Sequence, residues 1–389
     1  MKLLKKIYSA YILVVFLLLL NSCTRQPIIY NSVKPTTFKN VFENYWNEMK
    51  RNYVYWDIDI TNWDDVYSKY APVFSELNMN NSNDVRACVR YFRDITKNLV
   101  DNHYTIDFIN SLIADSSIFP AYERKKNLPA FHEPYPYWKI DTNYLDKGYL
   151  IGENTNFINN GQPLTILYGT IQNKILYISF NHFSLAESFG TSTGTSIQLI
   201  LQAYFSMLDN LPENIKGLIV DVRSNLGGDL NDLNFFAKHF VNTQHLFGYA
   251  QYKIGDGLYS FTPWFPAYIN PANLSKNISK PIIILADNFS ASTAEALVMF
   301  VKSIPNSTFI GETTFGATGA IINDSSMNYG SFTISNFMHV QTSSARFKYI
   351  DGKIYENEGF PPDIFIPFNL TAIQNGHDIA LEKAIDRIQ

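Results

Sequence analysis

Two short segments place chemically capable residues directly after apolar runs. The run PIIILA (281–286) leads into DNFSASTAEA, where Ser292 precedes a segment that predicts a helix from Thr293. A hydroxyl at a helix N-terminus lies near free backbone N–H groups, and negative charge there is stabilised by about 0.3–1 kcal/mol. A nucleophilic serine would occupy such a strand-to-helix turn. The alternative is that Ser290 or Ser292 only caps the helix.

The second segment is GLIVDVRSNLGG (217–228), an apolar run that ends in two glycines. Gly227 and Gly228 permit a tight turn whose backbone N–H groups point outward and can hold an anion. The alternative is a plain turn beside a surface ion pair. Asp221 and Arg223 are better explained as residues that hold this turn than as reactants.

A serine nucleophile needs a base, and the base is oriented by a third group. Of the seven histidines, His103 follows a predicted helix at a turn, and His182, in the strand-end sequence FNHF, is its chief rival. Glu356 and Glu358, in YENEGFPPD (355–363), are candidates for the orienting group, although a glutamate in a loop is usually only solvated.

The elements that must position these residues follow an alternating pattern from Ile166 onward. Continuous apolar strands separated by helices indicate a sheet covered on both faces, the α/β class. The strands are expected at 174–180, 217–222, 281–286 and 308–311, and the helices at 196–208, 230–241, 293–303 and 377–388.

Four regions precede this domain, which we place at residues 166–389. Apolar residues at helical spacing predict helices at 38–53, from Trp63 to Leu77 and from about Ser82, so residues 37–110 form a small helical domain. Residues 111–165 include Pro120, Pro129, Pro134 and Pro136, which break any regular pattern, and are expected to be an irregular connection.

The N-terminus reads as a secretion signal. Three lysines precede an apolar run at 10–20, which ends in Leu20-Asn21-Ser22-Cys23. This resembles a bacterial lipoprotein signal, in which residues 1–22 are removed and Cys23 is lipidated; an ordinary signal peptide is the alternative. Residues 23–36 would then be a polar tether to the membrane.

Composition excludes several classes of protein. The 389 residues are 46% hydrophobic and 17% charged, with a net charge of −4, so we expect a globular chain that does not bind nucleic acid. Two cysteines exclude a disulfide framework and a thiolate zinc site. We expect neither a metal nor an organic cofactor.

Together the motifs resemble the tail-specific serine peptidases: the C-terminal processing peptidases, the tricorn core protease and the interphotoreceptor retinoid-binding protein. Four segments resemble the family's signatures, in its order and spacing: Asp221–Gly228, Phe289–Glu295, Gly311–Gly316 and Glu356–Asp363. Asp101-Asn102-His103 resembles the turn that ends the helical domain of many bacterial members. No peptide-binding PDZ module is evident in residues 104–165.

The resemblance implies one of two catalytic designs. A Ser-Lys dyad needs a lysine where this chain has Ala317, and Lys302, the nearest lysine, does not match. The tricorn-like design pairs serine with histidine, supported by a glutamate, and His103 and Glu356 match it. Tricorn has a serine just before the histidine, where this chain has Asn102.

The resemblance therefore implies a fold of stacked ββα units, shared with ClpP and crotonase, and a serine endopeptidase of proteins or peptides in the cell envelope. Ser292 would be the nucleophile and His103 the base. Glu356 would orient His103, with Asn102 relaying between them, and amides of the turn at Gly227, Gly228 and Thr293 would form the oxyanion hole. A non-catalytic binding protein for a peptide or apolar ligand is the main alternative, and a crotonase-type acyl-CoA enzyme is a weaker one.

Overall fold

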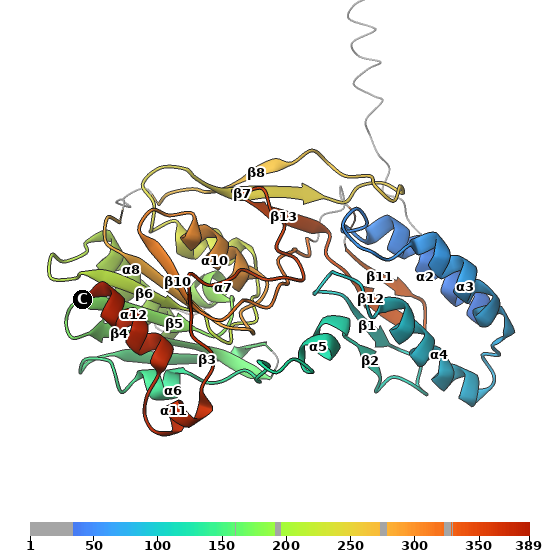
Figure 1. Ribbon diagram of the computed structural model, residues 1–389, viewed down its shortest axis with the longest axis horizontal. Helices are drawn as coiled ribbons and strands as arrows, with labels where there is room; N and C mark the ends of the chain where they lie inside the picture. Colours follow the sequence, from blue (N-terminus) through green and yellow to red (C-terminus); the bar gives the residue numbers. More distant parts are fainter. Residues whose placement is uncertain (1–33, 160, 191–195, 273–277, 323–327, 329) are drawn as a thin grey trace, which may run out of the picture.

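Two bodies joined by a bridging sheet make up the chain (Figure 1). This computed structural model describes residues 34–389 except 160, 191–195, 273–277, 323–327 and 329. The lipidation site predicted at Cys23, the signal and most of the tether lie outside the described residues. No helix in the described part of the chain is both long and apolar enough to cross a membrane.

The larger body is built on a seven-stranded sheet of order β14-β10-β9-β6-β5-β4-β3. The five strands from β5 to β14 run parallel, and β3 and β4 are antiparallel additions at one edge. Every residue of β6 and β9 is buried, as expected for strands covered on both faces. The strands are β3 (Leu150–Asn159), β4 (Gln162–Ile171), β5 (Ile175–Phe180), β6 (Gly217–Asp221), β9 (Ile282–Ala286), β10 (Ser307–Gly311) and β14 (Ile364–Phe365).

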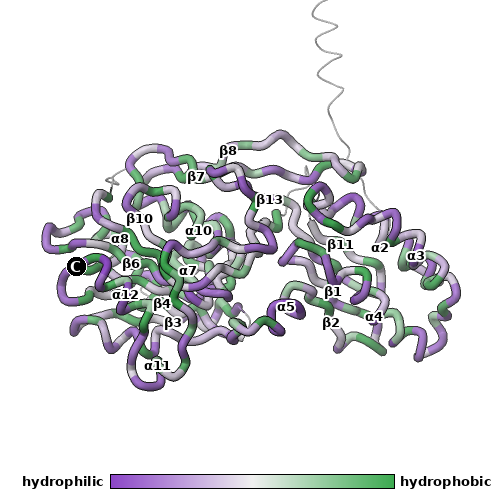
Figure 2. The backbone as a smooth tube through the Cα atoms, in the orientation of Figure 1, coloured by the Kyte–Doolittle hydropathy of each residue, from purple (hydrophilic) through white to green (hydrophobic). Residues whose placement is uncertain are grey.

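Helices cover both faces of this sheet, which confirms the α/β class. Alternate strand residues such as Ile282 and Ile284 face α8 (Ser196–Asp209), α9 (Asn231–Ala237) and α10 (Thr293–Lys302). Their neighbours Ile283 and Leu285 pack against α12 (Ile379–Ile388) on the opposite face. Figure 2 shows apolar residues along the strands and hydrophilic residues on the surrounding loops.

The remaining helices of this body are short. They are α6 (Trp138–Asp141), α7 (Leu185–Gly190) and α11 (Leu370–Gln374). The helix predicted at 230–241 is shorter than expected, since α9 ends at Ala237, and the last helix begins at Ile379 rather than at residue 377.

The smaller body contains the three predicted helices, whose N-termini are capped by Thr37, Asn62 and Asn81. It also contains a four-stranded sheet, β11-β12-β1-β2, that the sequence pattern did not predict. Two of these strands come from residues 331–341, so the body is neither purely helical nor confined to residues 37–110. The elements are α2 (Phe38–Asn52), α3 (Trp63–Glu76), α4 (Ser82–Thr96), β1 (Thr105–Phe108), β2 (Ser117–Ile118), β11 (Ser331–Ile334) and β12 (Met338–Gln341).

A third sheet, of order β13-β7-β8, bridges the two bodies (Figure 1). Its strands are β7 (His245–Tyr252), β8 (Phe265–Ile269) and β13 (Ala345–Tyr349). Residues 342–344 connect β12 of the smaller body to β13 of the bridge. The connection expected at 111–165 is more regular than its prolines suggested, because it includes β2, α5 (Pro120–Lys125), α6, β3 and the start of β4.

Candidate functional site

Ser292 lies between the end of β9 and the first residue of α10. Its backbone has φ 57° and ψ −121°, a conformation that costs a non-glycine residue about 1–3 kcal/mol. The Ser292 N–H donates to the Ala317 carbonyl at 3.1 Å. Its side chain is partly exposed, whereas the helix behind it is buried. A strained turn thus presents this hydroxyl at the positive end of α10.

Glu295 holds the turn in this shape. Its buried carboxylate accepts hydrogen bonds from the Thr314 hydroxyl at 2.5 Å, from the Gly316 and Ala317 N–H groups at 2.7 Å each, and from the Ser292 N–H at 3.3 Å. Burial raises the pKa of Glu295 to about 7, and these donors oppose the rise. The sequence reasoning missed this residue, although Ser292 and Glu295 have the spacing of a capping box.

The glycine turn packs directly against the Ser292 turn. Gly227 has φ +84°, and a Cβ there would lie 2.6 Å from the Ser292 Cβ and 2.9 Å from the Thr293 nitrogen. The Thr293 hydroxyl donates to the Gly228 carbonyl at 2.8 Å, and the Ala291 N–H donates to the Asn225 carbonyl at 2.9 Å. These contacts fix the two predicted anion-binding turns against each other.

Of the three backbone N–H groups predicted to form the oxyanion hole, one already donates a hydrogen bond to another described residue and two do not. The Gly227 N–H donates to the Asn225 side-chain oxygen at 2.9 Å, so including Gly227 among the donors was wrong. The Gly228 and Thr293 N–H groups donate to no other residue in the described part of the chain. These two N–H groups are therefore free to donate hydrogen bonds to an oxyanion that develops beside Ser292.

His103 lies at the turn between α4 and β1, in the smaller body. Its Nδ1 lies 3.4 Å from the Ser343 hydroxyl, which itself donates to Asp101 Oδ1 at 2.9 Å. Since the Ser343 proton points to Asp101, the Ser343 oxygen can accept a hydrogen bond from the Nδ1–H group of His103, and Nε2 is then the unprotonated ring nitrogen. Burial lowers the pKa of His103, and the negative charge of Asp101 opposes this.

Asp101 is the acid that faces His103, and the sequence reasoning gave it no role. Its carboxylate also accepts from the His103 N–H at 2.9 Å, from the Ser343 N–H at 2.7 Å and from the Thr342 hydroxyl at 2.8 Å. Thr342 and Ser343 come from the strand connection between the bodies, 241 and 242 residues away from Asp101 in sequence. No motif pointed to them.

Glu356 joins three segments rather than contacting the His103 ring by a hydrogen bond. Its buried carboxylate accepts from the backbone N–H of Asn102 at 2.7 Å, from the Tyr55 hydroxyl at 2.9 Å, and from the N–H groups of Thr318 and Gly319 at 2.8 Å each. Burial raises the pKa of Glu356, and the donors oppose this. Glu356 thus positions the loop that carries His103.

The Asn102 side chain does not connect Glu356 to His103. Its amide donates to the Phe315 carbonyl at 3.1 Å, and its oxygen accepts from Arg124 at 3.1 Å. The relay expected through Asn102 is therefore absent from the described residues, and the contact between Glu356 and Asn102 is made by the backbone N–H of Asn102. The side chain instead ties the His103 loop to residues 315–317, which also support Ser292.

No hydrogen bond joins the Ser292 hydroxyl to the His103 ring among the described residues. Catalytic hydrogen bonds are often long in unliganded enzymes and shorten when substrate binds. No acid among the described residues bonds to the ring of the rival histidine: His182 is buried beside Phe183, which pairs with Gly228, and its Nδ1 lies 3.3 Å from the Ser184 hydroxyl. Lys302 forms an ion pair with Asp363 at 2.7 Å, away from these turns.

Asp101, His103 and Glu356 also bring potential metal-ligand atoms within 4.8 Å of one another. The donor set does not suit a metal, because each of the four carboxylate oxygens already accepts at least one hydrogen bond from the protein. The arrangement suits the orientation of an imidazole instead.

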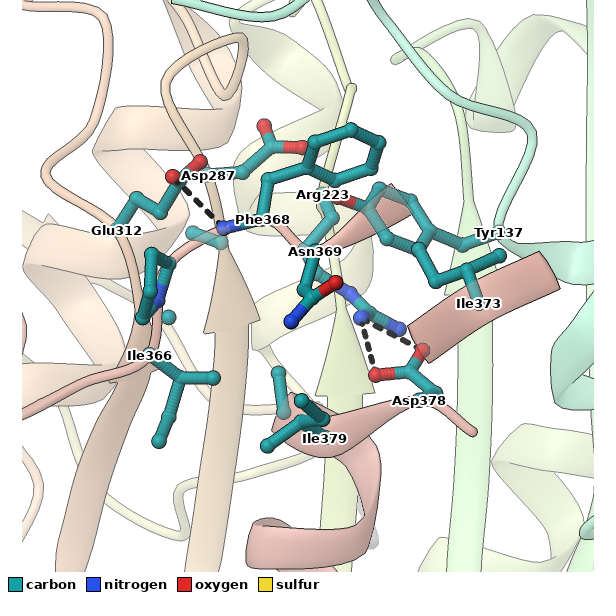
Figure 3. A pocket seen from close by; sticks show the side chains of 14 residues that line it. Tyr137, Arg223, Asp287, Glu312, Ile366, Phe368, Asn369, Ile373, Asp378 and Ile379 are labelled. Atoms are coloured by element: carbon teal, nitrogen blue, oxygen red, sulfur yellow. Dashed lines mark hydrogen bonds and ion pairs between the residues drawn. The ribbon is translucent and has the colours of Figure 1, made fainter. Parts of the chain in front are cut away.

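Arg223 anchors the glycine turn from behind. It donates to Asp378 at 2.8 and 2.9 Å and to Asp221 at 3.0 Å, and its guanidinium lies 3.9 Å from the centre of the Tyr137 ring (Figure 3). All three charged groups are buried. Asp378 also caps α12, so this network joins the turn to the helix on the far face of the sheet.

Part of the chain resembles a known protein family. Residues 174–366 match the description of peptidase family S41. The chain carries a peptidase family S41 domain. This S41 domain contains the glycine turn, Ser292 and Glu356, whereas Asp101 and His103 precede it.

Relatives support the same family. The chain is 29% identical to the nisin-resistance protein of Lactococcus lactis subsp. lactis over 179 residues, which are 44% of this chain and 53% of that protein. It is also 29% identical to the carboxy-terminal processing protease CtpB of Bacillus subtilis (strain 168) over 104 residues, 27% of this chain and 20% of that protein. The matches therefore span about half of these relatives or less.

A solved structure supports the fold over nearly the whole chain. A protein from Parabacteroides merdae ATCC 43184 superposes with a TM-score of 0.68 at 24% identity, covering 91% of this chain and 97% of that one. The likeness includes the smaller body as well as the S41 domain.

Proposed function

We propose that this protein is a serine endopeptidase that hydrolyses peptide bonds through Ser292 and His103. The observation that carries the proposal is the Ser292 turn: a strained backbone presents the hydroxyl at a helix N-terminus, beside the two available amides of Gly228 and Thr293. Membership of family S41 agrees with this chemistry.

In the proposed reaction, His103 Nε2 takes the Ser292 proton as the oxygen attacks the substrate carbonyl. The Gly228 and Thr293 amides stabilise the oxyanion, and each such donor is typically worth about 2.7–4 kcal/mol in the transition state. The imidazolium then protonates the leaving amine, and water, deprotonated by the same ring, releases the acyl group from Ser292.

The remaining residues position the base. Ser343 accepts a hydrogen bond from the Nδ1–H group of His103 and donates its own proton to Asp101, whose negative charge stabilises the imidazolium. Glu356 holds the backbone of Asn102 and therefore the loop on which His103 lies.

A fluorophosphonate probe and steady-state kinetics on an unstructured protein substrate test the proposal. We expect the adduct on Ser292 and not on Ser290, whose hydroxyl is buried and donates to the Val222 carbonyl at 2.7 Å. Ser292→Ala and His103→Ala should each lower kcat by several orders of magnitude, and the double variant should lose little more, because the two residues act as a unit.

The matched control is His182→Ala, which should keep kcat within about tenfold because that ring has no place in the mechanism. Circular dichroism verifies folding of every variant. A folded wild type that neither labels nor cleaves any substrate would favour the non-catalytic binding protein.

We further propose that the protein is anchored in the cell envelope by lipid on Cys23. The support is the Leu20–Cys23 pattern at the end of a short apolar run. Metabolic palmitate labelling should mark the wild type and not Cys23→Ala; equal labelling of both would contradict the anchor.

A further inference from the structure

The short helix α5 lies between the two bodies (Figure 1). Its Ala121 is fully buried and packs in one apolar cluster with Ala291, Phe315 and Ala317. Ala291 precedes Ser292, and Ala317 supplies the carbonyl that accepts the Ser292 N–H. One face of α5 therefore rests on the residues that shape the nucleophile's turn.

Arg124 fixes α5 to the other half of the site. Its guanidinium donates to the side-chain oxygens of Asn102 at 3.1 Å and Asn357 at 3.2 Å, and to the Lys97 carbonyl at 2.8 Å. Asn102 precedes His103, and Asn357 follows Glu356. Arg124 therefore connects α5 to the two segments that orient His103, one containing Asn102 and the other containing Glu356.

Lys125 follows Ala121 by four residues in α5, so the two side chains lie on the same face of the helix. Its ammonium lies 4.9 Å from the centre of the Phe315 ring, and the residue is only partly exposed. Its ammonium forms no ion pair or hydrogen bond with any residue that the structure describes, although the Lys125 backbone carbonyl accepts from the Leu128 N–H at 2.9 Å. Other lysines differ: Lys97 pairs with Asp94 at 2.7 Å, and Lys302 pairs with Asp363 at 2.7 Å.

The acids nearest to Lys125 do not neutralise it directly. Glu295 and Glu356 attract its charge, but their carboxylates are occupied by the backbone and hydroxyl donors described above. Burial lowers the pKa of Lys125, and Arg124 beside it lowers the pKa further. A desolvated cation without a partner gains when an anion arrives, and the anion that a peptide can offer is a carboxylate.

We propose that Lys125 binds a carboxylate of the substrate next to the scissile bond and makes the site selective for peptides that carry one there. The carboxylate belongs either to an aspartate or glutamate side chain or to the free C-terminus of the peptide. This inference rests on the proposed peptidase function.

The test compares kcat/KM for four peptides of one sequence: with Asp or Asn beside the scissile bond, and with a free or amidated C-terminus close to it. The wild type should prefer one carboxylate over its neutral partner by at least about tenfold, mainly through KM. The Asp–Asn pair and the acid–amide pair show which carboxylate is bound.

Lys125→Ala should abolish that preference, and Lys125→Arg should retain most of it. Lys126→Ala is the matched control, because Lys126 is exposed and its ammonium lies 5.8 Å from the Tyr122 ring. This control should keep the wild-type preference. Thermal unfolding of each variant verifies folding.

Three outcomes would overturn the inference. A wild type that cleaves all four peptides equally would remove the specificity role and leave the peptidase function intact. A Lys125→Ala variant that loses kcat equally on all four would make Lys125 part of proton transfer rather than of substrate selection. A wild type that cleaves none and does not label at Ser292 would refute the peptidase function and the inference together.

Discussion

Replacing Gly227 by alanine should disrupt the proposed oxyanion hole and lower kcat while leaving the fold largely intact. The added methyl would lie 2.6 Å from the Ser292 Cβ, 2.7 Å from the Ala291 carbonyl oxygen and 2.9 Å from the Thr293 nitrogen. Contacts under 3.0 Å cannot be kept, so the two turns must separate. The methyl would also lie over the Thr293 N–H, one of the two amides proposed to hold the oxyanion.

Two costs can be separated. Alanine at φ +84° is strained by about 1–2 kcal/mol, which lowers the free energy of unfolding. Losing one oxyanion donor typically costs about 2.7–4 kcal/mol of transition-state stabilisation, a fall in kcat of about 10²–10³. The expected result for Gly227→Ala is therefore a kcat reduced by at least 10² in a protein that remains folded at 25 °C.

Gly352 provides a matched control. Its φ is +89°, but a Cβ there would meet no atom within 4 Å. Gly352→Ala should therefore carry a similar backbone strain without loss of kcat. The assay is kcat on an unstructured protein substrate, with urea unfolding of both variants. If folded Gly227→Ala keeps kcat within tenfold of the wild type, the glycine turn does not shape the oxyanion hole.

Two further predictions concern charge. Because burial lowers the pKa of His103, kcat/KM should fall as the pH is lowered, with the midpoint of this fall below the ordinary histidine pKa of about 6.5. The Asp101→Asn variant loses the negative charge that raises the His103 pKa, so this midpoint should move to a still lower pH and kcat should decrease. A pH midpoint that does not move would remove Asp101 from the mechanism. Arg223→Leu removes the ion-pair partner of the buried carboxylates of Asp221 and Asp378 and should lower the free energy of unfolding by about 3–5 kcal/mol. The control is Lys302→Leu, which should lower it by about 1 kcal/mol or less because the partner of Lys302, Asp363, is exposed. Equal losses of stability in urea unfolding of the two variants would refute the structural role of Arg223.

The larger body could be predicted from sequence because its strands are continuous apolar runs. Residues 217–222 and 281–286 can only be buried on both faces, so the helices between them must cover a parallel sheet. The sheet of the smaller body could not be predicted in the same way. Its strands have two to four residues, too few to show a period, and β11 and β12 reach it from more than 200 residues away.

Some residues of the candidate site could likewise be predicted from local sequence patterns, and others could not. Ser292 and the glycine turn follow apolar strands, so their position at the carboxyl edge of the sheet follows from local pattern. Asp101 was visible in the sequence but had no assignable partner, because Ser343 is brought to it only by the connection between β12 and β13. Lys125 gave no signal at all, since a lysine at the end of a six-residue helix is ordinarily solvated.

Because the proposed nucleophile and base lie in different bodies, a glutamate that is close to the histidine in space but distant from it in sequence is needed to connect them. Ser292 belongs to the larger body and His103 to the smaller one, so the distance between them depends on the contacts that cross over. Glu356 makes such a contact: it accepts from Tyr55 and Asn102 on one side and from Thr318 and Gly319 on the other. Its buried carboxylate thus sets the position of the base relative to the nucleophile, which is a structural requirement of the proposed mechanism rather than a separate chemical step.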